Sequence, residues 1–256
     1  LCRDMLEEDG LTDAEIENEL SVMYVQEGFI LQSLSKTAQA DGTENERALA
    51  IYTKILTQHP TDPNVLSVAS NNVITLRTGS GRVWDSLKKS SKAIGNLDLK
   101  DMTLSARQKS AIQLNRALAL FHGKQYDKAR DLLVALVKEF PSNVQQSIAL
   151  AAVLAKDKAR MKEAEEVFNT YLKTQSETAP IESVQAVYLG LTHLALMKND
   201  FVQAAQVLST LVESAKFGAN LRHRPGVVAT QVALFEKAGQ LDGAHRVIQA
   251  AVDYWK

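Results

Sequence analysis

The sequence predicts an all-α fold, a right-handed α-solenoid of stacked helix pairs. The first observation is that five alanines each precede a bulky apolar residue by four positions, the separation of about one helical turn. The second is that only 12 glycines and 5 prolines occur in 256 residues. This shortage favours helix over a β-rich or disordered chain. The alanine pairs are Ala48 with Tyr52, Ala129 with Leu133, Ala164 with Phe168, Ala204 with Leu208 and Ala244 with Ile248.

Each position of this pattern has a physical reason. Only a small side chain fits where the two helices of a pair cross closely, and the bulky residue one turn later fills the core between pairs. Pro60 and Pro141 end two of the second helices, because proline cannot continue a helix. Together these positions form the second half of the tetratricopeptide pattern. The last four alanines also follow a large apolar residue by three positions, namely Tyr126, Met161, Phe201 and Leu241.

The spacing of the alanines predicts how many pairs the chain holds. Successive alanines are 81, 35, 40 and 40 residues apart, whereas the ideal tetratricopeptide period is about 34 residues. The spacing of 81 must contain a further unit that lacks the alanine. We place this divergent unit at about 64–103, with its second helix at 83–94. We therefore expect about five to six helix pairs in a single repeat domain over residues 1–256.

The N-terminal elements follow from helix start and stop signals. Residues 1–8 resemble the tail of a second helix from an earlier repeat, so the chain is expected to be a fragment of a longer one. Thr12 and Asp13 mark the start of the first complete helix. Helices are expected at 14–34, 48–58 and 64–76, with a long loop at 35–46 and another loop at 77–82.

From residue 104 onward the apolar pattern is regular and predicts four helix pairs. Short polar turns separate the two helices of each pair, and a break around Pro225 separates the last two pairs. The predicted pairs are 104–122 with 126–139, 142–156 with 160–174, 181–197 with 201–216, and 225–238 with 241–255.

Composition argues against several classes of protein. The formal net charge of −1 argues against the whole segment being a nucleic-acid binder, which normally has a basic excess. The single cysteine, Cys2, cannot form an internal disulfide, which suits a reducing compartment. No apolar run approaches the roughly 18 residues that would span a bilayer.

No residue pattern indicates catalysis or a metal site. The loop Gly79-Ser80-Gly81 lacks the Lys-Ser or Lys-Thr that would meet phosphates, and it follows a helix where a phosphate loop follows a strand. We therefore expect no enzyme, no cofactor and no metal. The histidines are also not spaced as metal-ligand pairs; they are His59, His122, His193, His223 and His245.

The first helices of the pairs supply the candidate partner-binding residues, because they form the concave wall in this architecture. A partner segment is expected to lie along them and to bury apolar side chains there. Asn72 has an equally good interpretation as a structural amide bonded to neighbouring backbone. The candidates are Asn71 and Asn72 on one first helix, and Leu114, Asn115, Leu118 and Phe121 on another.

Two basic clusters leave an RNA interface open. One contains Lys88, Lys89 and Lys92, and the other contains Arg222 and Arg224. Solvated helix faces explain both clusters better, because only Trp84 is available nearby to stack on a base.

Several ordered segments resemble one known family. They occur in the same order as in the 72-kDa protein subunit of the eukaryotic signal recognition particle, over most of the chain from about Glu17 to Lys256. None of them is a catalytic signature. The segments are NVLSVASNNVITLRTGSGRVWDSLKK at 64–89, AIQLNRALAL at 111–120, HRPGVV at 223–228 and the closing DYW at 253–255.

This resemblance implies a function. It implies the N-terminal tetratricopeptide-repeat domain of that subunit, a scaffold that binds the C-terminal region of the 68-kDa subunit in its groove. The particle targets ribosomes making secretory proteins to the endoplasmic reticulum, so a cytoplasmic ribonucleoprotein that associates with the reticulum surface is implied. Contact with the particle RNA is implied mainly through a basic C-terminal region absent from this chain.

Two alternatives stay open at this point. The repeats themselves could contact the particle RNA through the basic clusters, in which case binding would depend steeply on salt. The domain could instead be a general tetratricopeptide adaptor for another peptide partner.

Overall fold

The computed structural model describes residues 2–37, 41–77 and 102–256. Within these ranges the chain forms helices joined by turns, and no strand occurs. The predicted all-α fold of tetratricopeptide-like helix pairs is therefore confirmed. The glycine-containing loop at 79–81, the basic cluster at 88–92 and the divergent helix at 83–94 lie outside the described residues.

The chain divides into two compact units, Leu1–Ala129 and Arg130–Lys256. The boundary falls within one helix, α7 (Tyr126–Glu139). The expectation of a single repeat domain over the whole chain stays a prediction.

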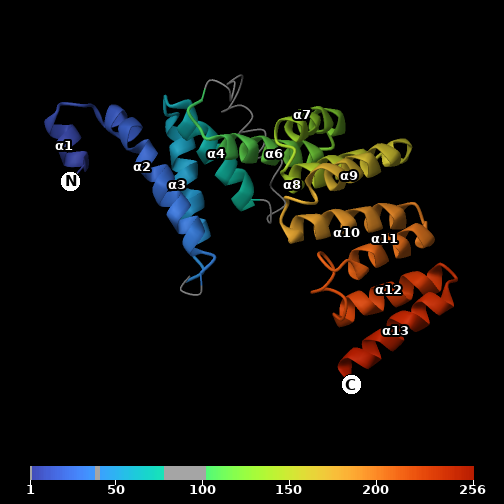
Figure 1. Cartoon of the computed structure of the whole chain (residues 1–256). Coiled ribbons are helices and arrows are strands. Elements are labelled where there is room, and N and C mark those ends of the chain that lie inside the picture. The colour runs from blue at the N-terminus through green and yellow to red at the C-terminus, as the bar shows by residue number, and fades with distance from the viewer. Residues whose placement is uncertain (1, 38–40, 78–101) are drawn as a thin grey trace. The chain divides into compact units, whose positions relative to one another are not determined.

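The first unit is built from helices that pack in chain order. Helix α2 packs against α3 and α4, α3 packs against α4, and α4 packs against α6. Figure 1 shows the C-terminal part of α2 beside α3. The helices are α1 (Cys2–Glu8), α2 (Asp13–Leu34), α3 (Glu44–Gln58), α4 (Pro63–Arg77) and α6 (Ala106–His122).

Capping residues fix where these helices begin. The Thr12 hydroxyl accepts a hydrogen bond from the backbone N–H of Glu15, whose carboxylate in turn accepts from the Thr12 backbone N–H. Ser105 and Gln108 form the same reciprocal box before α6. Each box satisfies backbone N–H groups that the first turn of a helix leaves unpaired. The predicted helix starts near residues 13 and 104 are thus confirmed to within two residues.

Helix α3 begins earlier than predicted, at Glu44 instead of residue 48. The Glu44 carboxylate accepts hydrogen bonds from the backbone N–H groups of Asp41 (2.7 Å) and Gly42 (3.0 Å). The loop is therefore closed by the first residue of the helix. The predicted loop over 35–46 therefore ends before Glu44. This residue is the first of helix α3, and its carboxylate also binds the backbone of the loop.

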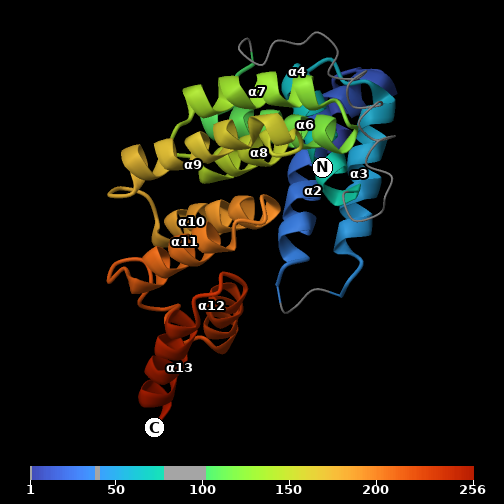
Figure 2. The same cartoon turned by 90° about the vertical axis from the view of Figure 1, so that its right-hand side faces the viewer.

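The second unit is a series of paired helices. In Figures 1 and 2, α8 lies beside α9, α10 beside α11, and α12 beside α13. Each pair also contacts the next, through α9 with α10 and α11 with α12. The helices are α8 (Val144–Leu154), α9 (Met161–Gln175) after a 3₁₀ turn at Lys158–Arg160, α10 (Ile181–Met197), α11 (Phe201–Glu213), α12 (Pro225–Lys237) and α13 (Leu241–Trp255).

Helix α11 ends at Glu213, three residues before the predicted end at 216. Arg222 donates hydrogen bonds to the carbonyls of Val212 (3.3 Å) and Glu213 (2.9 Å). These carbonyls belong to the last turn, where a helix leaves C=O groups without an intrahelical partner. Gly218 lies so close to this helix end that a Cβ there would come 2.2 Å from the Val212 carbonyl oxygen. The returning chain therefore terminates α11.

The alanines identified in the sequence lie at the helix crossings. Four of the five have no exposed surface, and Ala244 is also buried. Their bulky partners one turn later are buried too, with the exception of Ile248, which is 46% exposed. Ile248 is on α13, the last helix described, and no following helix packs on that face.

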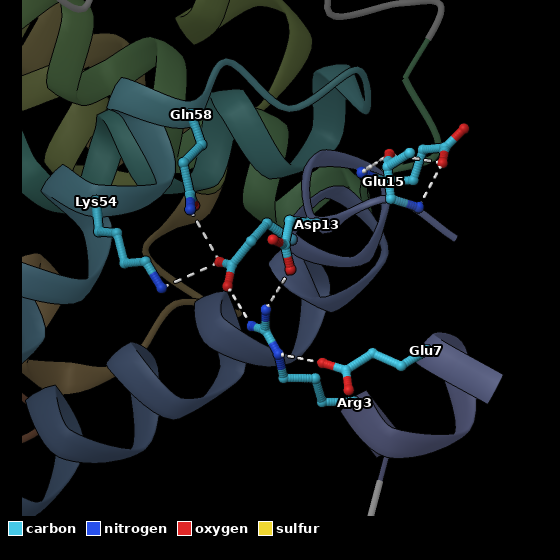
Figure 3. Close-up of polar contacts among 8 residues, drawn as sticks. Arg3, Glu7, Asp13, Glu15, Lys54 and Gln58 are labelled. Atoms are coloured by element: carbon cyan, nitrogen blue, oxygen red, sulfur yellow. Dashed lines mark hydrogen bonds and ion pairs between the residues drawn. The ribbon is translucent and has the colours of Figure 1, made fainter. Parts of the chain in front are cut away.

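A charged cluster joins α1, α2 and α3, and Figure 3 shows its members Arg3, Lys54 and Gln58. The Glu17 carboxylate, whose side chain is only 18% exposed, accepts from Arg3 (2.9 Å), Lys54 (3.0 Å) and Gln58 (2.9 Å). The hydrogen bonds from Gln58 and then Lys54 lower the pKa of Glu17 despite its partial burial. Arg3 also binds Asp13, so the short helix α1 is tied to α2.

Among the described residues, no helix combines the length and apolar character needed to cross a bilayer. In the same residues no group of His, Cys, Asp or Glu side chains is arranged to hold a metal ion.

Candidate functional site

The structure brings together candidates that are 44 positions apart in the sequence. Asn71 and Asn72 lie on α4, and Asn115 lies on α6. The side chain of Asn115 donates from Nδ2 to Oδ1 of Asn71 at 2.8 Å. Two adjacent first helices are therefore joined through asparagine side chains.

The hydrogen bonds continue from α4 to α3 and form what we call the amide row: Asn115, Asn71, Asn72 and Tyr52. Asn71 Nδ2 donates to Asn72 Oδ1 (3.1 Å), and Asn72 Nδ2 donates to the Tyr52 hydroxyl (2.9 Å). All three donations run in the same direction, from α6 toward α3. The three asparagines are half-buried, so one edge of the row remains accessible.

Tyr52 fixes one end of the amide row. Its side chain is fully buried in the core of the first unit, and its ring lies against Gly28 of α2, where a Cβ would come 2.8 Å from the ring. Burial raises the pKa of Tyr52, and the hydrogen bond from Asn72 lowers it by less. The hydroxyl is therefore protonated at neutral pH and accepts from Asn72 as a neutral group.

The structural interpretation of Asn72 is partly supported by these contacts. Asn72 bonds to the side chains of Tyr52 and Asn71, whereas the sequence suggested a bond to neighbouring backbone. The amide therefore has a structural role that links α3 with α4. Its contact with a partner stays a prediction.

The three apolar candidates on α6 differ in exposure. Leu114 is 8% exposed and lies in the core, so it supports the helix and offers a partner little surface. Leu118 is 37% exposed and lies one turn beyond Asn115 on the same side of α6. Phe121 is half-buried, with its ring 5.6 Å from that of Tyr126. Of these three, Leu118 offers the most surface for a contact.

A second polar contact lies beside the amide row. Gln32 on α2 donates to the Thr75 hydroxyl on α4 at 3.4 Å. Thr75 lies one turn after Asn71, and Val68 lies one turn before it, both half-buried. Amide and hydroxyl groups thus join α2 to α4 and α4 to α6.

The first helices of the second unit present a different surface. On α10, Leu189 is 50% exposed and Met197 is 46% exposed, with exposed His193 between them. These positions follow at four-residue steps, so they form one stripe along the helix. None of the three was among the candidate partner-binding residues predicted from the sequence, although the four-residue spacing of Leu189, His193 and Met197 is visible there.

A groove in the second unit lies between two second helices, α7 and α9. Its volume is about 720 Å³, and Val134, Leu150 and Val167 supply apolar walls. Arg160 and Glu163 pair at its rim (2.9 Å). No histidine or cysteine lines the groove, and we assign no chemistry to it.

The basic residues proposed as an RNA contact have mixed placements. Arg222 is occupied with the carbonyls at the end of α11, while Arg224 is exposed at the start of α12. His223 between them stacks on Tyr254, with ring centroids 3.7 Å apart. This segment is therefore a packed connection, in which Arg222 bonds to the end of α11 and does not lie on the solvated helix face that the sequence favoured.

Comparison with protein families and known proteins agrees with this geometry. A family model described as "Tetratricopeptide repeat" matches residues 111–143, which include parts of α6 and α7. Among solved structures, the chain is similar to a tetratricopeptide repeat protein from Parabacteroides merdae (TM-score 0.60, 14% identity, 92% of this chain and 80% of that one). It is also similar to PilF of Pseudomonas aeruginosa (TM-score 0.54, 14% identity, 90% of each chain). These structures support the fold.

Curated relatives cover the full chain at higher identity. The chain is 28% identical to signal recognition particle subunit SRP72 of Canis lupus familiaris and of Homo sapiens, over 100% of this chain and 35% of each relative. It is 29% identical to the subunit of the same name from Dictyostelium discoideum, over 95% of this chain and 35% of that relative. The chain thus spans about a third of the length of these relatives.

Proposed function

Because the chain belongs to the family of signal recognition particle subunit SRP72, we propose that it is a protein-binding scaffold of that particle. The proposed partner is the C-terminal region of the 68-kDa subunit, held along the first helices. The proposed role is the assembly of a cytoplasmic particle that targets nascent secretory proteins to the endoplasmic reticulum. Contact with the particle RNA is assigned to a basic region outside this chain.

The observation that carries this proposal is the surface formed by α4 and α6. It combines half-buried amides, Asn71 and Asn115, with the exposed apolar side chain of Leu118. Such a mixture of apolar contact and paired polar groups is typical of protein–protein interfaces.

The charge of the chain supports a protein partner over RNA. The formal net charge is −1, and of the two basic clusters only the one with Arg222 and Arg224 lies within the described residues. Arg222 is used to close α11. An RNA-binding surface would require several cations directed at phosphates. Contacts distributed along several helices can give specific binding to a polypeptide without one deep pocket.

The test is a calorimetric titration of this chain with the C-terminal segment of the 68-kDa subunit at two salt concentrations. We expect binding with a negative heat-capacity change, which marks burial of apolar surface, and with little salt dependence. The absence of heat for a chain that is folded and helical would refute the proposed partner. A steep loss of affinity with salt would instead favour an electrostatic interface.

A pair of matched variants locates the interface. Leu118→Asp places a charge on exposed α6 and is expected to lower affinity at least tenfold, a loss of about 1.4 kcal/mol. Val134→Asp makes the same change at a residue that is 50% exposed on α7, a second helix, and is expected to leave affinity unchanged. Equal effects of the two variants would place the interface elsewhere.

A further inference from the structure

A second apolar surface lies on helix α2, on the side that faces away from α4. Met23 and Ile30 are seven residues apart and Leu34 follows four residues later, so the three side chains form one stripe along the helix. They are 52%, 57% and 43% exposed. Gln32, which bonds Thr75 of α4, lies two residues from Ile30. Because a helix turns by about 100° per residue, the stripe and the contact with α4 are on nearly opposite sides of α2.

Val22 and Phe29 widen this surface. They are also seven residues apart, and they are 45% and 61% exposed. On its other side α2 buries Leu31 in the core that it shares with α3. The C-terminal half of α2 is thus apolar on two sides, and a helix that is apolar all round is normally covered by neighbours all round. The outer face of α2 is defined as Val22, Met23, Phe29, Ile30 and Leu34.

Helix α1 already occupies the beginning of the same stripe. It packs against α2, and Ile16, seven residues before Met23, is only 1% exposed. Arg3 of α1 donates to the carboxylates of Asp13 (2.8 Å) and Glu17 (2.9 Å), and Figure 3 shows Arg3 directed at Asp13. The 7 residues of α1 are about 10 Å long and the 22 residues of α2 about 33 Å. Helix α1 therefore covers only the first part of the stripe.

The charges around the outer face select a cationic partner. Helix α2 contains five aspartates and glutamates and no lysine or arginine. Glu19 and Glu27 lie one turn before and one turn after Met23, both are exposed, and neither pairs with a cation of the described residues. Residues 1–77 hold 13 acidic side chains against 5 lysines and arginines. This excess of negative charge repels RNA and anionic lipid surfaces and attracts a basic polypeptide.

We propose that the outer face of α2 docks a cationic amphipathic helix of another protein, beside α1 and in the same manner as α1. Such a helix packs its apolar side against Met23 and Ile30 and places lysine or arginine on Glu19 and Glu27. The segment from Val22 to Leu34 is about 18 Å long, enough for three turns of the docked helix. The inference is independent of the partner proposed for α4 and α6 and adds a second interaction surface to the scaffold.

A helix suits the outer face better than an extended segment does. The five side chains that define the face carry no hydrogen-bonding group, so an extended main chain would leave water without new partners. The backbone of a helix is already bonded internally. Two polar residues, Gln26 and Ser33, lie between the apolar rows, and the Ser33 hydroxyl donates to the Phe29 carbonyl of its own helix (2.8 Å).

The test is the binding of a synthetic cationic helix to the unmodified chain, measured by fluorescence anisotropy. The probe is a labelled peptide of about 18 residues, long enough to form a helix, with leucines at helical spacing and lysines elsewhere. One comparison peptide has glutamate in place of every lysine. The other has the same composition with leucine at alternate positions, a strand pattern. We expect the lysine helix to bind at least tenfold more tightly than either, and less tightly as salt is added.

Protein variants locate the site. Ile30→Gln changes an exposed apolar residue in the middle of the outer face and should lower affinity for the lysine helix about tenfold. The control, Leu189→Gln, makes a comparable change at a residue that is 50% exposed on α10 and should have no effect. The double variant Glu19→Gln with Glu27→Gln should lower affinity about two- to fivefold at low salt and reduce the salt dependence. Unchanged urea denaturation of each variant shows that it is folded.

The opposing results are distinct. Equal losses for Ile30→Gln and Leu189→Gln would overturn the inference, because the probe would then bind exposed apolar surface wherever it occurs. Equal binding of the lysine and glutamate helices would overturn the choice of a cationic partner. Self-association of the chain that Ile30→Gln abolishes in sedimentation would assign the outer face to a second copy and overturn the inference as well. If the folded chain binds no probe, this inference fails and the function proposed for α4 and α6 stands.

Discussion

The contact between Gly28 and Tyr52 makes a specific prediction about stability. An ideal Cβ at Gly28 would lie 2.8 Å from the Cε1 and Cζ atoms of the Tyr52 ring and 3.2 Å from its hydroxyl. Carbon atoms pack favourably only at about 3.5–4.0 Å. Tyr52 is fully buried, so its ring cannot move aside into solvent. Gly28→Ala should therefore displace the ring or separate α2 from α3.

The expected magnitude follows from opposing terms. Alanine is favoured over glycine within a helix by about 0.5–1 kcal/mol. Overpacking a filled core costs about 1–3 kcal/mol, and a displaced ring also loses the hydrogen bond from Asn72, about 0.5–1.5 kcal/mol. We expect the free energy of unfolding of Gly28→Ala to fall by about 1–3 kcal/mol. The affinity for the partner should fall as well, because Tyr52 anchors the amide row.

The assay is urea denaturation followed by far-ultraviolet circular dichroism, with Gly226→Ala as the matched control. Gly226 is the second residue of α12, and an added Cβ there meets nothing within 4 Å. The control should therefore gain up to about 1 kcal/mol from helix propensity alone. If Gly28→Ala stabilises the chain as much as Gly226→Ala does, the packing argument is wrong.

Two further predictions concern the charged cluster and the end of α11. Since hydrogen bonds from Gln58 and Lys54 lower the pKa of Glu17, its stabilising contribution is present above the ordinary carboxyl value of 4.5 and is lost as pH falls through the lowered pKa. The protection factors of the α1 amides, which compare measured hydrogen exchange with the intrinsic rate at each pH, should therefore fall in acid, and Glu17→Gln should reduce that pH dependence; an unchanged profile would contradict the reasoning. Arg222→Ala removes the donors to two carbonyls of α11 and should destabilise the second unit by about 1–2 kcal/mol in thermal or urea melts. Arg224→Ala, which removes an exposed side chain, should change the melt little, and equal losses would mean that Arg222 acts by charge alone.

The fold could be predicted because its signals are local. An alanine and a bulky residue four positions later lie on one helix face, so Ala164 with Phe168 predicts a crossing without knowledge of other helices. Helix starts such as Thr12 were equally accessible, because the capping box spans only four residues. The end of α11 could not be predicted in this way. It depends on Arg222, which lies nine residues beyond Glu213 in the sequence and bonds back to the end of the helix.

The candidate site was predictable only in part. Asn71 and Asn115 were each selected from their helix positions, but their hydrogen bond depends on how α4 is set against α6. Leu114 was selected with Leu118, one turn later on the same helix, but the structure buries Leu114 and leaves Leu118 37% exposed. A single sequence places residues on a helix and leaves the rotation of that helix against its neighbours to the packing.

The free energy of unfolding can also show whether the amide row serves the fold or the binding of a partner. Replacing both partners of a half-buried polar pair by apolar side chains of similar shape is often neutral or stabilising, so Asn71 and Asn115 are not the choice that maximises packing between α4 and α6. The double variant Asn71→Leu with Asn115→Leu should therefore have a free energy of unfolding equal to or above that of the unmodified chain, while its affinity for the 68-kDa segment falls. Gain of stability with loss of binding is the relation expected of residues that serve recognition. A double variant that loses stability and keeps its affinity would show instead that the asparagines serve the fold alone.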